Sequence, residues 1–598
     1  MKPCERWADD RGLAARLDES DAVAEWLAAI GREHILRGSV SSGLACTGIA
    51  AAVLSRQSRR LTSQAIERNL QAAARRIDAA VDPAPDPSPA RSGRPAVLHV
   101  LSEALPAGGH TAMAVRWMRS DVARSHAIAL LDQQVPVAEE LCHAVAEAGG
   151  RIYEPPRAAT LAGRATWLRT LARRDFDFVV LHVDVSDVVA GTALGVDGGP
   201  PVLLVNHAAH AFWTGATTVD AVVNCRGSQL EDEWTREHRG ARQSLCVPIP
   251  LVGDAPVLDR AAVRRELGLP ADAVVLLTAG AYYKFLPVEG QDFLAACRTV
   301  LREADDVVVL AAGFHGDERW TRTSAESGHR LRTLGVVSRD GMARLRAAAD
   351  VYVEGFPFGT TTALLEAGLC GLPAVLAPAT SPPPYGTDGL ATDSCLVRPA
   401  SPDRYVASVL ELVRSPTARA RVGARLREAV ASTHSGEGWR RHVDDCFHAV
   451  GATHRVSVPR ACPPTPEPLH LPWARVVERT SSAYDERLEL ALIDCWSRGV
   501  HPRLEREFVA RLADGRRLAR ARSAPLGVVA GLAAAVSAGL PPGVGRVLLK
   551  SASYVRRHGP LRAPYRLLQR VRRAGPARGD SYDDYKAAAR AAAARPGE

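Results

Sequence analysis

Three consecutive threonines, Thr360, Thr361 and Thr362, follow Gly359 at the point where a helix is predicted to begin. The free backbone N–H groups and the positive dipole end of a helix start form an anion site, and hydroxyl groups there add hydrogen-bond donors. Glu366 follows one helical turn later, so its carboxylate would face the same ligand and could accept hydrogen bonds from two ribose hydroxyls. A phosphate at the helix start with a ribose beside it indicates a nucleotide.

The alternative interpretation of this stretch is structural. The threonines could cap the helix, and Glu366 could be a solvated helix residue. The motif alone favours neither interpretation, because short motifs have high false-positive rates. Glu354, twelve positions before Glu366, ends the strand that leads into the turn and is a further candidate contact to the ligand.

Two histidines, His207 and His210, follow a strand predicted at 202–205. Ligands of Rossmann-like domains bind at the carboxyl ends of the strands, so both imidazoles stand where a ligand would bind. An imidazole titrates near neutral pH and could act as a base toward a hydroxyl, or donate a hydrogen bond to a sugar or a phosphate. Metal binding is a weaker alternative because no third ligand is visible nearby, and a structural role at the strand end stays open.

A glycine pair, Gly108 and Gly109, follows the first predicted strand of the same region and precedes His110. Glycine permits a close approach of the backbone to a ligand. The pattern is not G-x-G-x-x-G, so we infer no nicotinamide cofactor.

Short apolar runs alternate with helical segments between residues 95 and 450, which is the pattern of parallel sheets covered by helices. A proline-rich passage near residue 250 interrupts the alternation, which then restarts. We therefore predict an α/β fold with two Rossmann-like domains in tandem. The first domain has strands predicted at 96–101, 127–131, 178–183, 202–205 and 219–223. The second has strands predicted at 273–278, 307–311, 331–336, 351–354 and 374–377.

Helical extensions are predicted on both sides of the two domains. Apolar residues recur at helical spacing before residue 80, where we assign no chemistry, and again after residue 480. The predicted organisation is a helical N-terminal extension at 1–81, a proline-rich linker at 82–94, the first domain at 95–254, the second domain at 255–452, a second proline-rich linker at 453–473 and a helical, basic C-terminal extension at 474–598.

The composition is that of a globular protein. The chain has 598 residues, of which 46% are hydrophobic and 24% charged, so three or four structural units are expected. Its 11 cysteines show no C-x-x-C spacing, which argues against a zinc or disulfide framework and indicates reduced thiols. The first ten residues are charged and lack an apolar core, which argues against a secretory signal. We therefore expect a cytoplasmic location.

The C-terminal extension contains a possible membrane contact at 524–578. An apolar run at 526–540 is too short to cross a bilayer, because 15 helical residues reach about 22 Å. The stretch 546–578 holds ten basic residues and no acidic one, which is typical of a segment attracted to an anionic membrane surface. A buried alanine-rich helix pair with a solvated arginine face is an alternative. Nucleic acid is not an expected partner, because the chain has no recognised nucleic-acid motif.

These features together resemble the GT-B glycosyltransferases over residues 95–450. The resemblance implies that the second domain binds a sugar nucleotide and the first domain an acceptor. The segment from Glu354 to Glu366 is similar to a stretch of the O-GlcNAc transferase family, in which two acidic residues flank a Gly-x-Thr-Thr turn and the second contacts the ribose. Glu366 falls one position later than in that pattern. The segment also resembles the Glu-x7-Glu motif of retaining families, although its spacing is four residues longer.

The same resemblance implies roles for three further groups. Lys284 follows the first strand of the second domain, where these enzymes place a cation against the diphosphate, and it is the only lysine between Lys2 and Lys550. An ammonium suits a leaving diphosphate whose charge grows during the reaction. Similar bacterial enzymes carry the Asn-His-x-x-His-x-Phe-Trp stretch that begins at Asn206. The glycine loop with His110 lines the cleft in related folds, and the fold normally needs no bound metal or other cofactor.

The leading hypothesis is a glycosyltransferase that moves a sugar from a nucleoside diphosphate sugar to a hydroxyl of a glycan, lipid-linked or protein acceptor. Polysaccharide or glycoconjugate biosynthesis would suit a peripheral membrane location. A sugar-nucleotide epimerase or a phosphorylase shares the architecture and is an alternative. A non-catalytic assembly protein that docks through its basic tail is another. The sugar, the base, the acceptor and the stereochemical outcome stay open.

Overall fold

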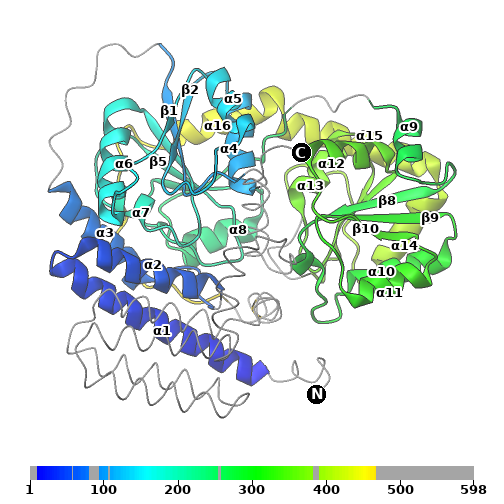
Figure 1. Cartoon of the computed structure of the whole chain (residues 1–598), viewed down its shortest axis with the longest axis horizontal. Coiled ribbons are helices and arrows are strands. Elements are labelled where there is room, and N and C mark those ends of the chain that lie inside the picture. Colours follow the sequence, from blue (N-terminus) through cyan, green and yellow to red (C-terminus); the bar gives the residue numbers. More distant parts are fainter. Residues whose placement is uncertain are drawn as a thin grey trace, which may run out of the picture.

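A computed structural model describes residues 10–56, 58–79, 93–105, 108–252, 258–381, 389–465 and residue 474. It contains two α/β lobes and a helical layer against the first lobe (Figure 1). The predicted membrane contact at 524–578, nearly all of the C-terminal extension and most of the linker at 82–94 lie outside the described residues. None of the helices in the described part is long and apolar enough to cross a membrane.

The first lobe is a seven-stranded sheet in which all strands are parallel, in the order β3-β2-β1-β4-β5-β6-β7. Its strands are β1 (Ala96–Leu101), β2 (Ser125–Leu130), β3 (Ile152–Tyr153), β4 (Phe178–His182), β5 (Val202–Val205), β6 (Ala221–Asn224) and β7 (Ser244–Cys246). The five predicted strands correspond to β1, β2, β4, β5 and β6. The two edge strands β3 and β7 were not predicted, because two or three residues give no periodic signal. The crossovers contain α4 (Gly109–Ser120), α5 (Glu139–Glu147), α6 (Leu161–Asp175), α7 (Val189–Ala193), α8 (Gln229–Glu233) and the π-helical turn η2 (Trp234–His238).

The second lobe is a five-stranded parallel sheet with the order β10-β9-β8-β11-β12. Its strands are β8 (Val274–Ala279), β9 (Val307–Ala312), β10 (Leu331–Thr333), β11 (Val351–Val353) and β12 (Ala374–Val375). All five were predicted. The lobe also contains α9 (Arg260–Glu266), η3 (Tyr282–Phe285), α10 (Phe293–Glu303), α11 (Glu318–Glu326), α12 (Arg339–Ala348), α13 (Thr361–Leu369), α14 (Pro402–Arg414) and α15 (Pro416–His434). The predicted α/β fold with two Rossmann-like domains is confirmed.

The helical layer consists of α1 (Asp10–Leu36), α2 (Val40–Arg56) and α3 (Gln64–Asp78), which lie along one side of the first lobe (Figure 1). Their apolar side chains share a core with Val188 and Phe212 of that lobe. The buried carboxylate of Glu67 on α3 accepts hydrogen bonds from the backbone N–H of Gly215, at 2.7 Å, and of Thr217, at 3.1 Å. The layer therefore supports the loop that follows β5.

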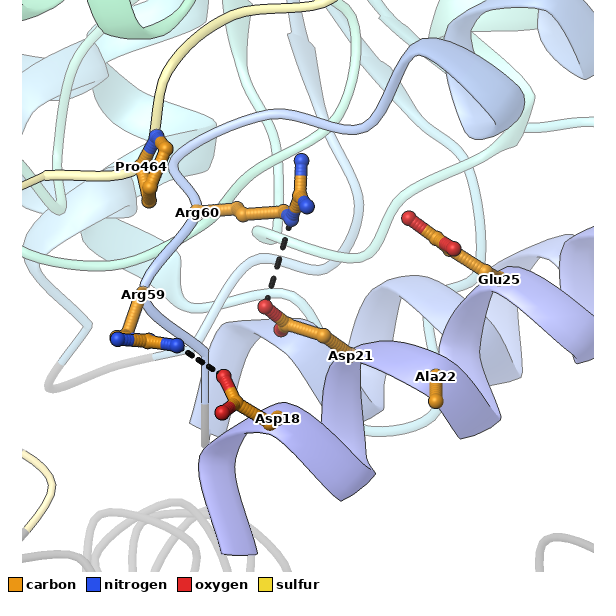
Figure 2. A pocket seen from close by; sticks show the side chains of 7 residues that line it. All are labelled: Asp18, Asp21, Ala22, Glu25, Arg59, Arg60 and Pro464. Atoms are coloured by element: carbon orange, nitrogen blue, oxygen red, sulfur yellow. Dashed lines mark hydrogen bonds and ion pairs between the residues drawn. The ribbon is translucent and has the colours of Figure 1, made fainter. Parts of the chain in front are cut away.

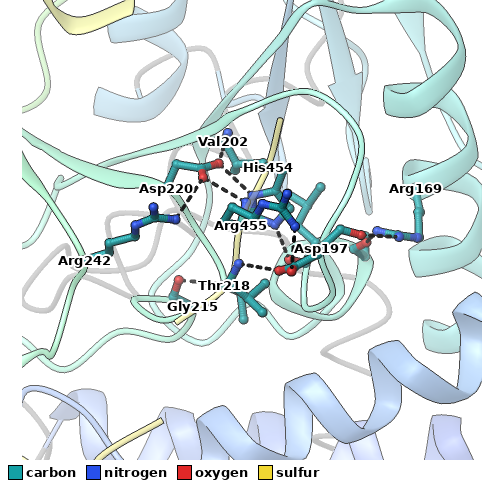
Figure 3. A network of polar contacts seen from close by, with 12 residues as sticks. Arg169, Asp197, Val202, Gly215, Thr218, Asp220, Arg242, His454 and Arg455 are labelled. Atoms are coloured by element: carbon teal, nitrogen blue, oxygen red, sulfur yellow. Dashed lines mark hydrogen bonds and ion pairs between the residues drawn. The ribbon is translucent and has the colours of Figure 1, made fainter. Parts of the chain in front are cut away.

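The chain returns to the first lobe after the second sheet. Trp439 and Phe447 of α16 (Gly436–Ala449) pack in one core with Trp117 of α4. The next segment adds polar contacts, because the carboxylate of Asp220 accepts a hydrogen bond from His454 Nδ1 at 2.7 Å (Figure 3). Residues 436–465 are thus built into the first lobe although the second sheet precedes them in the chain.

Candidate active site

The carboxyl ends of the two sheets face each other across the domain boundary, and α13 lies on the side of the second lobe nearest the first (Figure 1). Helix α13 follows β11 through the turn at 355–360, and it begins at the threonines where a helix start was predicted. The side chain of the N-cap residue, Thr360, makes no capping hydrogen bond. The backbone N–H groups at the start of α13 are therefore available to an anion.

Two cationic side chains from different domains meet at this helix start. Lys284, on η3 after β8, donates a hydrogen bond from Nζ to the carbonyl oxygen of Gly359 at 3.2 Å. Arg226, which follows β6 of the first lobe, donates from Nε to the hydroxyl of Thr361 at 3.2 Å. The hydroxyl of Thr360 is 2.9 Å from that of Tyr352. Thr362 lies in the same first turn of α13. The structure thus gathers the predicted lysine and threonines and adds an arginine.

The ammonium group of Lys284 is in an unfavourable environment for a charge. Burial, with the nearby guanidinium of Arg226, lowers the pKa of Lys284 to about 8, against an opposing effect of the Glu354 carboxylate. A negatively charged ligand would stabilise the protonated form of Lys284. The site is therefore suited to a phosphate group.

Glu354 lies inside the protein behind the turn. Its side chain is fully buried, and its Oε2 accepts a hydrogen bond from the backbone N–H of Ala377 at 2.9 Å. Burial raises the pKa of its carboxyl group, while Arg398, Arg226 and Lys284 oppose the shift. A Cβ atom at Gly359 would lie 2.4 Å from Glu354 Oε1, so a side chain there would require the Glu354 carboxylate to move. The structure places Glu354 as a counter-charge to the cations, and a direct contact to a ligand stays a prediction.

Glu366 is paired with two arginines. Its Oε2 accepts a hydrogen bond from Arg346 of α12 at 2.9 Å, and its Oε1 accepts one from Arg116 of α4. The second of these ion pairs joins the two lobes. Ribose hydroxyls that donate to Glu366 would have to share its carboxylate with these arginines or displace them.

The predicted histidines lie at the carboxyl edge of the first sheet. The ring of His207 stacks on that of His110 with 4.1 Å between centroids, so the structure brings the glycine loop and His207 together. Gly108 precedes α4 directly, and Gly109 is its first residue. Burial lowers the pKa of His210 well below its usual value, and the charges of Lys284, Arg226 and Arg239 act in the same direction. His210 is thus a neutral imidazole on the side of the cations.

A family model described as "Glycosyl transferases group 1" matches residues 273–415 of the chain. The UDP-N-acetylglucosamine–N-acetylmuramyl-(pentapeptide) pyrophosphoryl-undecaprenol N-acetylglucosamine transferase of Clavibacter michiganensis subsp. michiganensis is 30% identical over 312 residues, which is 49% of this chain and 76% of that relative. The chain belongs to the GT-B glycosyltransferases. The predicted family is confirmed.

Two further comparisons show lower sequence identity. The D-inositol 3-phosphate glycosyltransferase of Nocardiopsis dassonvillei is 28% identical over 252 residues, covering 39% of this glycosyltransferase and 56% of the relative. The chain therefore spans little more than half of that relative's length. The solved structure of HepE from Anabaena in complex with UDP is 14% identical with a TM-score of 0.44, and the match covers 59% of this chain and 100% of that chain.

Several arginines of this glycosyltransferase site were not predicted from the sequence. Arg226 and Arg116 reach the second lobe as described, and Arg239 shapes the histidine loop. The buried guanidinium of Arg239 donates to the carbonyl oxygens of Ala209 and Ala211, at 2.8 and 2.9 Å, and covers the ring of Trp213 at 4.1 Å. Arginine is so common in this chain that a single one carries no signal. The only available hint was that Arg226 follows a predicted strand at its carboxyl end.

A separate surface pocket lies between α1 and the loop that precedes α3 (Figure 2). It is lined by Asp18, Asp21, Ala22, Glu25, Arg59, Arg60 and Pro464. Arg59 and Arg60 pair with Asp18 and Asp21, respectively, so the two cations of this pocket are already neutralised. Its carboxylates do not favour a diphosphate. Among the described residues no group of three or more side chains is arranged to hold a metal ion, and the absence of a resident metal stays a prediction.

Proposed function

We propose that this glycosyltransferase moves a sugar from a nucleoside diphosphate sugar to a hydroxyl group of an acceptor. The observation that carries the proposal is the meeting of Lys284, Arg226 and the uncapped start of α13 at the domain boundary. Three sources of positive potential, from two domains, are directed at one position. A diphosphate there would contact both lobes.

Donor binding and leaving-group stabilisation follow from the same groups. The N–H groups and hydroxyls of Thr361 and Thr362 would hold the diphosphate together with Lys284 and Arg226, and Glu366 would accept hydrogen bonds from the ribose. Negative charge grows on the diphosphate as its bond to the sugar breaks, and fixed cations with a helix dipole stabilise that charge. In this proposal no metal or other cofactor takes part.

The acceptor would enter from the first lobe. His207 would take the proton of the reacting hydroxyl, because it lies at the carboxyl edge of the first sheet beside His110. His210 would contact the transferred sugar or its phosphate as a neutral hydrogen-bonding group. Deprotonation strengthens the acceptor oxygen as a nucleophile toward the anomeric carbon.

The test is a panel of UDP-, GDP-, dTDP- and ADP-sugars, first for binding by thermal shift and then for turnover with acceptor extracts. At least one donor should raise the melting temperature of the wild-type protein, and Lys284→Met should abolish that shift. Protein that neither binds nor consumes any nucleotide sugar would contradict the proposal. Product analysis without acceptor separates the alternatives, because an epimerase would convert the donor by itself and a phosphorylase would require inorganic phosphate.

The proposal extends to a cytoplasmic enzyme of polysaccharide or glycoconjugate biosynthesis at the inner face of the membrane, with a glycan, a lipid-linked saccharide or a protein as acceptor. Its support is the basic character of residues 546–578. Flotation with vesicles of anionic and of neutral lipid tests the membrane contact. Full-length protein should float with anionic vesicles, and a variant with glutamine in place of the arginines at 556–573 should not. Equal partitioning of both proteins would contradict it.

A further inference from the structure

Four imidazoles form a continuous hydrogen-bonded row across the first sheet. They come from β2, β1, β4 and the end of β5, which are neighbours in the sheet in that order. His126 Nδ1 is 3.0 Å from His99 Nε2, and His99 Nδ1 is 3.1 Å from His182 Nε2. His182 Nδ1 is 3.2 Å from His207 Nε2. The row therefore runs from the interior of the lobe to the histidine that we place at the acceptor.

The hydrogen bond of His126, at the end of the row farthest from His207, determines which nitrogen of each ring carries the hydrogen. His126 Nε2 lies 2.9 Å from the backbone carbonyl oxygen of Asp121, which can only accept a hydrogen bond. His126 Nε2 must then carry the hydrogen, and its Nδ1 must accept from His99. The same argument repeats at His99 and at His182, because a neutral imidazole has one donor and one acceptor. At the near end, His207 must donate from Nε2 to His182, which leaves its Nδ1 without a hydrogen.

The row is neutral in the resting protein. His99, His126 and His182 have 0%, 1% and 0% of their surface exposed. Burial lowers the pKa of all four histidines, and the coulombic effect of His126 on His99 and of His99 on His182 adds to it. The carboxylate of Asp121 and the guanidinium of Arg124 act on His126 in opposite directions. Within the described part of the chain, Nδ1 of His207 has no hydrogen-bond partner.

We propose that His126, His99 and His182 are positioning residues that hold His207 as the Nε2–H tautomer, so that its bare Nδ1 accepts the proton of the acceptor hydroxyl. This inference rests on the proposed glycosyl transfer. The backbone carbonyl of Asp121 would then set the tautomer of a catalytic base four rings away. Burying three imidazoles inside a sheet is otherwise unfavourable, because both nitrogens of each ring need a hydrogen-bond partner there.

The step balances without a further reactant. The O–H bond of the acceptor breaks and a bond from Nδ1 of His207 to that hydrogen forms. The electron pair stays on the acceptor oxygen, which bonds to the anomeric carbon as the bond from that carbon to the diphosphate breaks. His207 becomes an imidazolium whose Nε2–H donates more strongly to His182, and it returns the proton to water after the product leaves.

The tautomer itself can be measured independently of activity. Protein labelled with ¹⁵N at the histidine ring nitrogens gives separate resonances for protonated and unprotonated nitrogens, and the spectrum of His207→Gln identifies those of His207. We expect Nε2 of His207 to be protonated and Nδ1 unprotonated in the wild-type protein. A protonated Nδ1 at His207 would overturn the proposal.

Two substitutions at the middle of the row connect the tautomer with catalysis. His182→Gln keeps one acceptor for His207 and one donor for His99, whereas His182→Leu removes both. We expect His182→Leu to lower kcat by about 100-fold, the lower end of what general acid–base catalysis contributes, with the donor KM unchanged. His182→Gln should restore most of the lost kcat and the wild-type tautomer of His207. Across the three proteins kcat should follow the fraction of His207 with an unprotonated Nδ1.

A matched control shows whether the loss comes from the row. His454 is also fully buried in the first lobe and makes two hydrogen bonds, at 2.7 Å to Asp220 and at 2.7 Å to the carbonyl oxygen of Leu194. His454→Gln should lower the melting temperature and leave kcat unchanged. A folded His182→Leu protein with wild-type kcat, or a kcat that does not follow the tautomer, would overturn the proposal. If the wild-type protein transfers no sugar at all, the proposed function fails, and the resonances of His207 still decide the tautomer.

Discussion

The Nε atom of Arg226 lies 3.2 Å from the hydroxyl oxygen of Thr361, and this hydrogen bond crosses from the first lobe to the start of α13 in the second. The guanidinium also pairs with the buried carboxylate of Glu231 at 2.5 Å, and this ion pair holds Arg226 in place within the first lobe. A diphosphate at the helix start would accept hydrogen bonds from the same guanidinium. Donor binding and domain closure would therefore use one side chain.

Replacing Arg226 by glutamine should weaken donor binding. A hydrogen bond to a charged group contributes about 1.5–3 kcal/mol, so we expect the donor KM to rise by roughly 10- to 100-fold. Steady-state kinetics with the donor found in the panel measures this change. Arg236→Gln is the matched control, because Arg236 is an exposed arginine of the same region with a surface ion pair to Asp232. A similar rise in KM for both variants would contradict the assignment.

Lys284 should make donor binding depend on pH. Its pKa is lowered to about 8, so the ammonium is charged below that pH and loses its charge above it. A diphosphate favours the charged form, and the Kd for the donor should increase as the pH rises through about 8. Calorimetric titration with a nucleotide sugar measures this, because the diphosphate of a nucleotide sugar has no ionisation of its own in that range.

The conservative variant Lys284→Arg is the control for this pH effect. A guanidinium stays protonated throughout the range, so the Kd of Lys284→Arg should be independent of pH around 8 even where its geometry makes binding weaker. An equal pH dependence in both proteins would show that another group is responsible.

Glu366 should recognise the ribose through its hydroxyls. We expect the wild-type protein to bind the nucleotide more tightly than its 2′,3′-dideoxy analogue by about 1–3 kcal/mol, because the carboxylate would lose its hydrogen-bond donors. Glu366→Ala should bind both nucleotides equally. Arg346→Gln tests the pairing arginine, and it should leave the preference for ribose in place. A preference that survives in Glu366→Ala would assign ribose recognition to another group.

The sequence predicted those parts of the site that depend on local patterns. The threonines and the helix start at Thr361 could be predicted because a strand, a glycine-containing turn and helical spacing follow one another within one short segment. Lys284 stood out because lysine is rare in this chain. The arginine partners of Glu366 and Thr361 could not be predicted, since Arg116 and Arg226 lie 250 and 135 positions away from them and meet them only through the packing of the two lobes.

The row of histidines was missed for a related reason. His99, His126 and His182 each stand within or at the end of an apolar run, where a single histidine gives no functional signal. Only the sheet brings them together, because β1 pairs with both β2 and β4, and His126 and His182 lie opposite Val97 and Leu101, each two positions from His99. The prediction named His207 and His110, whose rings stack in the structure, but the buried rings behind His207 needed the sheet order.

Asp220 should be a major contributor to the stability of the first lobe. Its carboxylate is 4% exposed and accepts hydrogen bonds from the backbone N–H of Val202 at 2.8 Å, from His454 at 2.7 Å and from the backbone N–H of Arg455 at 2.9 Å (Figure 3). Asp220→Ala leaves buried donors without an acceptor and should lower the free energy of unfolding by about 3 kcal/mol.

The control for this prediction is Asp197→Ala in the same network. Asp197 has 51% of its side chain exposed and pairs with Arg455 at 3.1 Å, so its loss should lower the free energy of unfolding by less than about 1 kcal/mol. Urea unfolding followed by tryptophan fluorescence compares the two variants, and the donor KM should stay unchanged in both. Equal midpoints for Asp220→Ala and the wild-type protein would show that residues 454–457 do not hold the first lobe together. A donor KM that rises in Asp220→Ala would instead connect this network with the active site, since the segment enters the lobe directly after α16, which packs on the same Trp117 as His99 and His182.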